Sequence, residues 1–220
     1  FVVPLTIAVL LPLFLVQKHG TARIGGLFGP VMLLWFASIA AIGLAEVVQH
    51  PGILAAADPR HAVRFFVANR WVAFLALGAV VLVITGVEAL YADLGHFGKT
   101  PIRLGWYSVV FPALLLNYFG QGALLLEEPA AAHNPFYELV PSWGLYPMIA
   151  LATLATIIAS QALISASYSI TRQAVQLGYF PRVSIVHTSA HEAGQIYIPK
   201  INIALMIGCI ALVVGFGEAS

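Results

Sequence analysis

Uncharged apolar runs divide this chain of 220 residues into six segments, and polar loops carrying glycine, proline and histidine separate them. The fourth run, from Leu104 to Leu126, has 23 uncharged residues. A helix of that length crosses a hydrocarbon core of about 30 Å, at about 1.5 Å per residue. By the same measure we place the spans at about residues 1–16, 24–45, 71–94, 104–126, 145–170 and 196–217. The pattern predicts an all-α, polytopic membrane protein with a single transmembrane domain over 1–220.

The composition supports this assignment and excludes several classes of protein. Hydrophobic residues make up 60% of the chain and charged residues 9%, whereas about a quarter of the residues in a soluble domain are charged. The net charge of +1 gives no basic surface for nucleic acid. Cys209 is the only cysteine, so no disulfide forms within the chain. Because the chain begins at Phe1 within an apolar run, we interpret it as an internal piece of a longer protein.

Lysine and arginine fall unequally on the two sides that alternating spans define. Seven of them lie in the loops 17–23, 92–103 and 172–200, and three lie in the opposite loop 49–70. The positive-inside rule therefore places the first three loops in the cytoplasm and the acidic residues of 127–138 outside. On this assignment the third span runs from outside to inside.

Glu88 is an acidic residue with no basic neighbour in an apolar stretch. Seventeen uncharged residues, from Trp71 to Val87, precede it, which places it well inside the third span. A carboxylate there costs on the order of 2.5 kcal/mol or more on insertion scales. We therefore predict a transport or proton-relay role for Glu88, and the alternative is a structural hydrogen bond to a neighbouring helix.

Three other residues of this span accompany Glu88. Thr85 lies one helical turn before it, so the two side-chain oxygens can converge on one site, and Tyr91 continues the same spacing. Gly86 is typical of close helix packing, but beside a buried acid it also suits an unwound helix whose carbonyls coordinate a cation. For Asp93, nearer the cytoplasmic loop, we favour a solvated helix-end carboxylate over a role in an inner vestibule.

Two later spans carry weaker polar signals. Asn117 and Gln121 share one face of the fourth span, where each amide needs a partner. We favour hydrogen bonding between helices for this pair, and lining of a polar pathway is the alternative. Thr156 and Ser160 belong to a hydroxyl stripe in the fifth span. Such hydroxyls can bond their own backbone carbonyls, or they can border an ion route.

The loop around His187, His191 and Glu192 contains metal-binding residue types but has no helical register for zinc, so we interpret it as a solvated loop. The chain has no glycine-rich phosphate cradle, nucleophile elbow or cysteine pair. The sequence therefore predicts no enzyme, no cofactor and no metal site beyond a transported ion.

One long motif is far more specific than these spacings. Residues 85–98 read TGVEALYADLGHFG, and Pro101-Ile102-Arg103 follows them. Shorter runs accompany it at 18–22, 28–30, 112–122, 159–162, 172–178 and 187–189. Together these runs cover most of the chain, and they resemble the KUP/HAK/KT family of potassium uptake permeases.

The resemblance implies a secondary transporter of the LeuT-like, amino acid–polyamine–organocation type, built from two inverted repeats of five helices plus extra helices. It implies coupled movement of potassium and protons across the cell (inner) membrane. The six segments then correspond to helices four to nine, and the third is the broken sixth helix. The first three helices and the tenth helix onward, with half of the potassium site, would be missing partners from the same polypeptide. A homodimer stays open.

The same resemblance implies roles for the polar residues of the third span. Thr85 matches a potassium ligand and Glu88 a proton-coupling carboxylate, and Tyr91 and Asp93 follow as further potassium-binding and proton-coupling residues. Asn117, Gln121, Thr156 and Ser160 remain candidates for lining the pathway.

Three other functions stay open beside this interpretation. A channel-like potassium pathway needs no proton coupling, but the chain lacks a filter of the Thr-Val-Gly-Tyr-Gly type. An organic-solute permease of the same fold would aim a half-helix N-terminus at a substrate carboxylate. In a structural membrane subunit, Glu88 would be paired across an interface and line no cavity.

Overall fold

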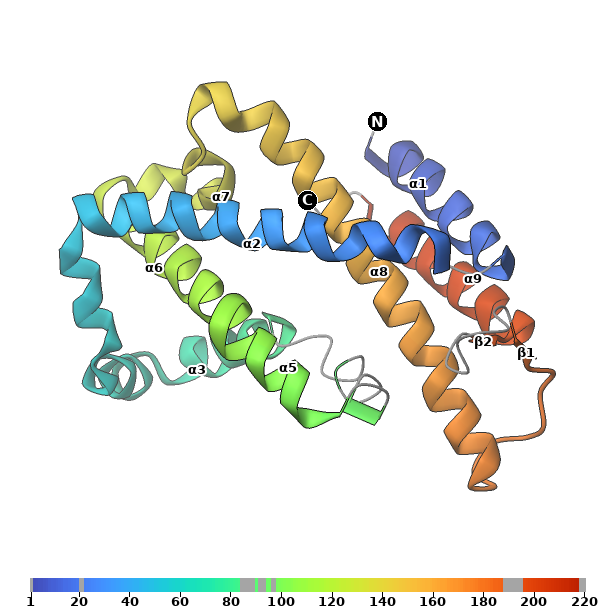
Figure 1. The fold of residues 1–220 in the computed structure, drawn as a ribbon. Coiled ribbons are helices and arrows are strands. Elements are labelled where there is room, and N and C mark those ends of the chain that lie inside the picture. The colour runs from blue at the N-terminus through green and yellow to red at the C-terminus, as the bar shows by residue number, and fades with distance from the viewer. Residues whose placement is uncertain are drawn as a thin grey trace. The chain divides into compact units, whose positions relative to one another are not determined.

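The computed structural model describes residues 2–19, 22–83, 90, 94–95, 98–187 and 196–217. Apart from a two-stranded β-ribbon, the regular structure of this part is helical (Figure 1). The α-helices are α1 (Val2–Val16), α2 (Ala22–Gln49), α3 (Pro59–Val83), α5 (Lys99–Gly105), α6 (Phe111–Glu127), α7 (Pro135–Glu138), α8 (Leu145–Gln176) and α9 (Pro199–Phe216). Tighter turns are η1 (Gln17–His19), η2 (Pro51–Ala57), η4 (Pro129–His133) and η5 (Ser142–Gly144), and η3 (Trp106–Val110) is a π-helical turn.

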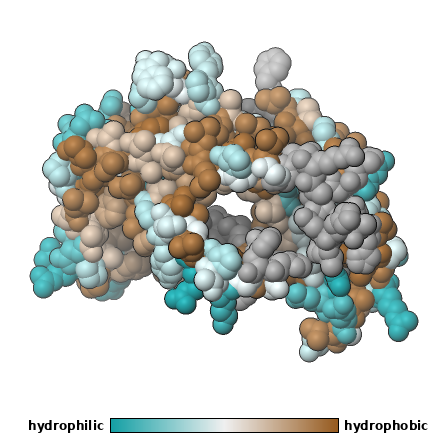
Figure 2. All heavy atoms as spheres, in the orientation of Figure 1, coloured by the Kyte–Doolittle hydropathy of each residue, from teal (hydrophilic) through white to brown (hydrophobic). Residues whose placement is uncertain are grey.

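Five helices of the described part are long and apolar enough to cross a membrane: Gly26–Gln49, Pro59–Val81, Lys99–Glu127, Ser142–Gln176 and Pro199–Phe216. Val3–Val16 is a shorter apolar helix. Apolar side chains cover much of the face shown in Figure 2, as a helix surface that meets lipid requires. The expectation of an all-α, multi-pass membrane protein is confirmed at this level.

Helix α3 differs from a straight span. It begins at Pro59, upstream of Trp71, and its first turn is capped by the Asp58 carboxylate, which accepts a bond from the Arg60 backbone N–H at 2.9 Å. Arg70 has φ of 22° and ψ of −81°, outside the helical region. A positive φ is unfavourable for a residue with a Cβ, so the chain is broken there into two helical pieces.

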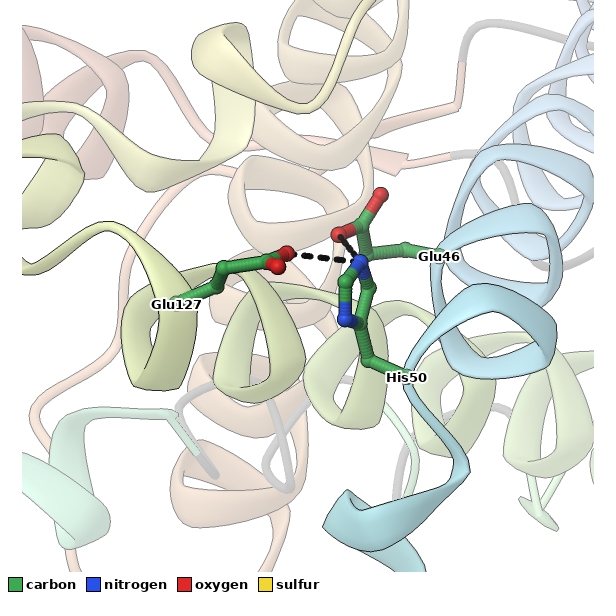
Figure 3. Close-up of side chains that lie close together, drawn as sticks. All are labelled: Glu46, His50 and Glu127. Atoms are coloured by element: carbon green, nitrogen blue, oxygen red, sulfur yellow. Dashed lines mark ion pairs between the residues drawn. The ribbon is translucent and has the colours of Figure 1, made fainter.

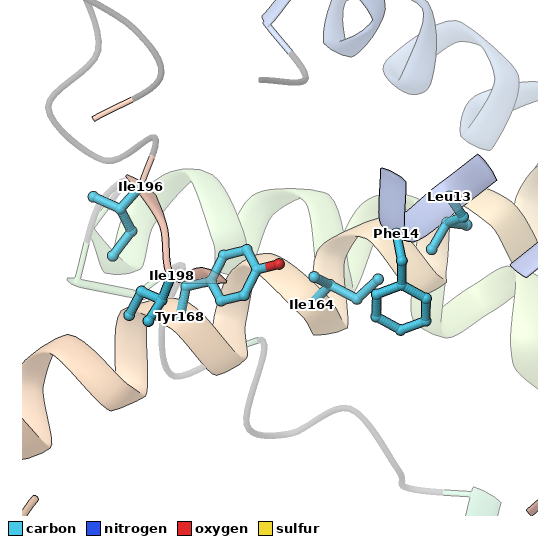
Figure 4. Packing of buried hydrophobic residues seen from close by; sticks show 6 residues of the cluster. All are labelled: Leu13, Phe14, Ile164, Tyr168, Ile196 and Ile198. Carbon is cyan, nitrogen blue, oxygen red and sulfur yellow. The ribbon is translucent and has the colours of Figure 1, made fainter. Parts of the chain in front are cut away.

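The chain divides into two compact units. The first takes in the described residues of 1–29, 88–98 and 156–220, and in it α1 and α9 lie side by side (Figure 1). Its core joins α1, α8, the ribbon and the start of α9 (Figure 4). The six residues of this core are Leu13, Phe14, Ile164, Tyr168, Ile196 and Ile198.

The β-ribbon supplies part of this core. Strands β1 (Val186–His187) and β2 (Ile196–Tyr197) are antiparallel, with Val186 opposite Tyr197. Ile196 and Ile198 are two residues apart in extended chain and therefore point to the same side. Both are buried in the cluster around Tyr168. The ribbon thus ties the start of α9 to α8.

The second unit takes in the described residues of 30–87 and 99–155. Helices α2 and α6 of this unit cross closely at Gly43 and Gly120. A Cβ on Gly120 would lie 2.6 Å from the Gly43 Cα, and a Cβ on Gly43 would collide with the Leu116 backbone carbonyl. Association of helices in lipid depends on close packing, since apolar side chains gain little by leaving lipid for protein. Small residues are therefore required on both helices here.

We expect Gly43→Ala to destabilise the protein by about 1–3 kcal/mol, because the added methyl group forces the α2 and α6 backbones apart. The measurement is thermal unfolding of the full-length protein in detergent. Gly208→Ala in α9 is the matched control, since a Cβ there has no neighbour within 4 Å. Equal melting temperatures for the two variants would contradict the crossing.

Candidate functional site

The side chains predicted to form the ion site, Thr85, Glu88, Tyr91 and Asp93, lie outside the described residues. Their roles stay predictions. The polar side chains that the structure does describe within apolar helices or at their ends fall into four groups.

The first group is on α6. Asn117 is buried, 7% exposed, and lies within one turn of Gly120 at the α2–α6 crossing, whereas Gln121 is half-buried. The Asn117 Oδ1 atom has no hydrogen-bond partner among the described residues. An amide oxygen left without a partner in an apolar environment is costly. Asn117 therefore offers an acceptor to a donor or cation from outside the described part of the chain.

The hydroxyl stripe of α8 bonds its own helix. Thr153 donates to the Ile149 carbonyl at 2.8 Å, and Ser160 donates to the Thr156 carbonyl at 2.9 Å. Ser167 and Thr171 repeat the pattern about two and three turns further on. This is the structural alternative considered above for these hydroxyls. A hydroxyl oxygen that donates in this way keeps lone pairs, so the pathway role of Thr156 and Ser160 stays a prediction.

Ser160 and Ser167 also line a cavity of about 160 Å³ within the first unit. The remaining lining comes from apolar residues of α1, α8 and α9, among them Phe14 and Leu205. A helical face with two hydroxyls therefore borders a small and otherwise apolar space.

A buried polar junction joins three helices of the first unit. The Tyr168 hydroxyl donates to Asn202 Oδ1 at 2.6 Å, and Asn202 Nδ2 donates to the Phe14 carbonyl at 3.2 Å. In η1, which directly follows α1, Gln17 Nε2 donates to Gln161 Oε1 at 2.5 Å. The sequence interpretation missed these residues. The available signal was an isolated amide in each apolar run, which must have a partner on another helix.

The fourth group is a cluster of ionisable residues at the ends of α2 and α6 (Figure 3). His50 Nε2 lies 2.7 Å from Glu127 Oε2 and 3.5 Å from Glu46 Oε1. Glu46 lies in the last turn of α2, His50 directly follows the last residue of that helix, and Glu127 is the last residue of α6. This cluster was also missed. The i, i+4 spacing of Glu46 and His50 was visible in the sequence, but the approach of Glu127 depends on the helix crossing.

A comparison with known families matches all of residues 1–220 to the K+ potassium transporter integral membrane domain. The chain belongs to this potassium transporter family. The resemblance inferred from the sequence motifs is therefore confirmed, and the family consists of transporters rather than enzymes.

This chain has curated relatives in bacteria. It is 61% identical over 220 residues to the probable potassium transport system protein Kup 1 of Paramagnetospirillum magneticum, covering 100% of this chain and 34% of that protein. It is 61% identical over 219 residues to Kup of Chlorobaculum tepidum, with 100% and 36% covered. For Kup of Myxococcus xanthus the identity is 58% over 220 residues, with 100% and 34% covered. The chain thus spans about a third of the length of these relatives. No solved structure matches it.

We expect Tyr168→Phe to destabilise the protein by about 1–2 kcal/mol, because Asn202 Oδ1 loses its hydrogen-bond donor while staying buried. Thermal unfolding in detergent measures this loss. Tyr146→Phe is the control, since Tyr146 is 80% exposed. If the two variants unfolded at the same temperature, the Tyr168–Asn202 bond would contribute nothing to stability.

Proposed function

We propose that the protein to which this chain belongs takes up potassium together with protons. The observation that carries the proposal is identity of 58–61% to proteins named as potassium transport systems, across the whole chain. The apolar helices support a membrane transporter rather than a soluble one. The motif at 85–98 supports an ion site on the third span.

The proposed architecture is a LeuT-like inverted-repeat transporter in the cell (inner) membrane. On this plan the chain supplies helices four to nine. Its partners are lipid, the transported potassium and protons, and the first three helices and the tenth helix onward of the same polypeptide. A homodimer is compatible with this plan, and no cofactor is required by it.

Potassium chemistry supports a role for Thr85. Potassium is a large, hard cation that hydroxyl and carbonyl oxygens satisfy, and an unwound helix supplies both. Thr85 is the proposed ligand, and the Tyr91 hydroxyl is a second candidate. The Asn117 Oδ1 atom, which has no hydrogen-bond partner in the described part of the chain, is an oxygen of the same class, and with Gln121, Thr156 and Ser160 it is a candidate for lining the pathway.

Glu88 is the proposed coupling group, and Asp93 is the second candidate. A carboxylate deprived of water favours its protonated form, and a nearby cation favours its ionised form. A group of this kind can take a proton in one state of the transporter and release it in another. Coupling then follows from competition between potassium and the proton for the same local charge.

Rubidium uptake by the full-length protein, with and without a proton gradient, tests the function. We expect a proton gradient to drive accumulation. Rubidium uptake that does not depend on the proton gradient would indicate a channel-like pathway. Uptake of an amino acid in place of rubidium would indicate an organic-solute permease, and no uptake of either would indicate a structural subunit.

Glu88→Gln is expected to abolish proton-driven rubidium accumulation while leaving rubidium binding detectable, because the amide cannot exchange a proton. Glu128→Gln is the control, since Glu128 is an exposed residue outside α6. Accumulation and proton coupling at wild-type levels in Glu88→Gln would overturn the assignment.

Thr85→Ala is expected to raise the KM for rubidium by about tenfold, as the loss of about 1.4 kcal/mol from one oxygen ligand implies. Thr85→Ser keeps the hydroxyl and is expected to stay near wild type. Equal KM values for the alanine and serine variants would remove Thr85 from the ligand set.

A further inference from the structure

Two helices of the second unit end at the same place. Helix α2 ends at Gln49 and helix α6 ends at Glu127, and the side chains of His50 and Glu127 meet there. The C-terminus of a helix carries about half a negative charge from its unpaired carbonyl groups, and this charge favours cations. The backbones of two such helix ends therefore create a negative local electrostatic field, without any contribution from side chains.

The side chains add to this field. Glu46 and Glu127 both make their ion pairs with His50. With a neutral imidazole the three side chains carry a charge of −2, and with a protonated imidazole they carry −1. The cluster therefore retains negative charge in either state of His50.

The three groups are also arranged as metal ligands. One imidazole nitrogen and two carboxylate oxygens lie within 4.8 Å of one another. Tetrahedral zinc with bonds of about 2.0 Å separates its ligand atoms by about 3.3 Å. The distances of 2.7 Å and 3.5 Å from His50 Nε2 fall on either side of that value. Small side-chain rotations are enough to form the site.

We propose that Glu46, His50 and Glu127 bind a divalent transition-metal cation of the zinc type. The mixed nitrogen and oxygen ligands suit Zn²⁺, Co²⁺ or Ni²⁺, whereas Mg²⁺ and Ca²⁺ take oxygen ligands. Three protein ligands leave a fourth position for water. The metal lies between Nε2 and the two carboxylates, and it joins the end of α2 to the end of α6.

The site is separate from the ion pathway proposed above. Its ligands belong to residues outside the motif at 85–98, and metal binding can be measured on a protein that transports nothing. Failure of the uptake experiment therefore leaves this proposal standing, and failure of the metal experiment leaves the uptake proposal standing.

Zinc titration of the untagged full-length protein in detergent tests the site. The readouts are competition with a chromogenic zinc chelator and the shift in melting temperature on adding ZnCl₂. We expect one zinc ion per chain at this site and a higher melting temperature. His50→Gln and Glu127→Gln are each expected to weaken zinc binding by about tenfold or more, since loss of a supporting residue alone costs that much.

Two exposed residues provide matched controls. His61→Gln removes a histidine from the first turn of α3, and Glu128→Gln removes the carboxylate next to Glu127. Both are expected to bind zinc within about twofold of wild type, because neither belongs to the ligand set. Glu127 is 61% exposed, so Glu127→Gln keeps the test valid if His50→Gln fails to fold. The proposal is overturned if wild type binds no more zinc than Glu127→Gln, which would leave a helix-end ion pair only.

Discussion

The structure depends on one constraint: a polar group inside an apolar helix must find a partner, because lipid offers none. The backbone amides of a helix form hydrogen bonds within the helix, and the hydroxyls of α8 donate hydrogen bonds to carbonyls of the same helix. The exposed amides of Gln49 and Asn69 also donate to a carbonyl one turn back on their own helix, whereas three buried amides have partners on other elements. Gln17, Gln161 and Asn202 are therefore the points at which one helix must meet another.

Close packing also holds helices together, in addition to these hydrogen bonds. At Gly43 and Gly120 the α2 and α6 backbones approach each other without side chains between them. This approach places Asn117 against α2 with an amide oxygen that has no hydrogen-bond partner among the described residues, and it brings Glu127 to the end of α2. One crossing of two glycines thus controls both an available acceptor within the membrane span and a charged cluster at its end.

These features belong to a member of a potassium transporter family. The chain spans about a third of the length of its relatives, and on the proposed architecture it contributes part of a larger helical bundle. The Asn117 acceptor is the kind of group that such a bundle, or an ion within it, can satisfy. The charged cluster lies at the helix ends, where the two carboxylates and the two helix termini attract a cation independently of any transport route.

Much of the fold was predictable from residue order. The length of the uncharged runs determined an all-α, multi-pass protein, and the motif at 85–98 determined the family, because both depend only on neighbouring residues. The position of Glu88 in an apolar run predicts a functional carboxylate, and this role stays a prediction. The tertiary structure alone decided the Tyr168–Asn202–Phe14 junction, the Gly43–Gly120 crossing and the meeting of His50 with Glu127. These contacts join residues far apart in sequence, and no local periodicity specifies which helices pack together.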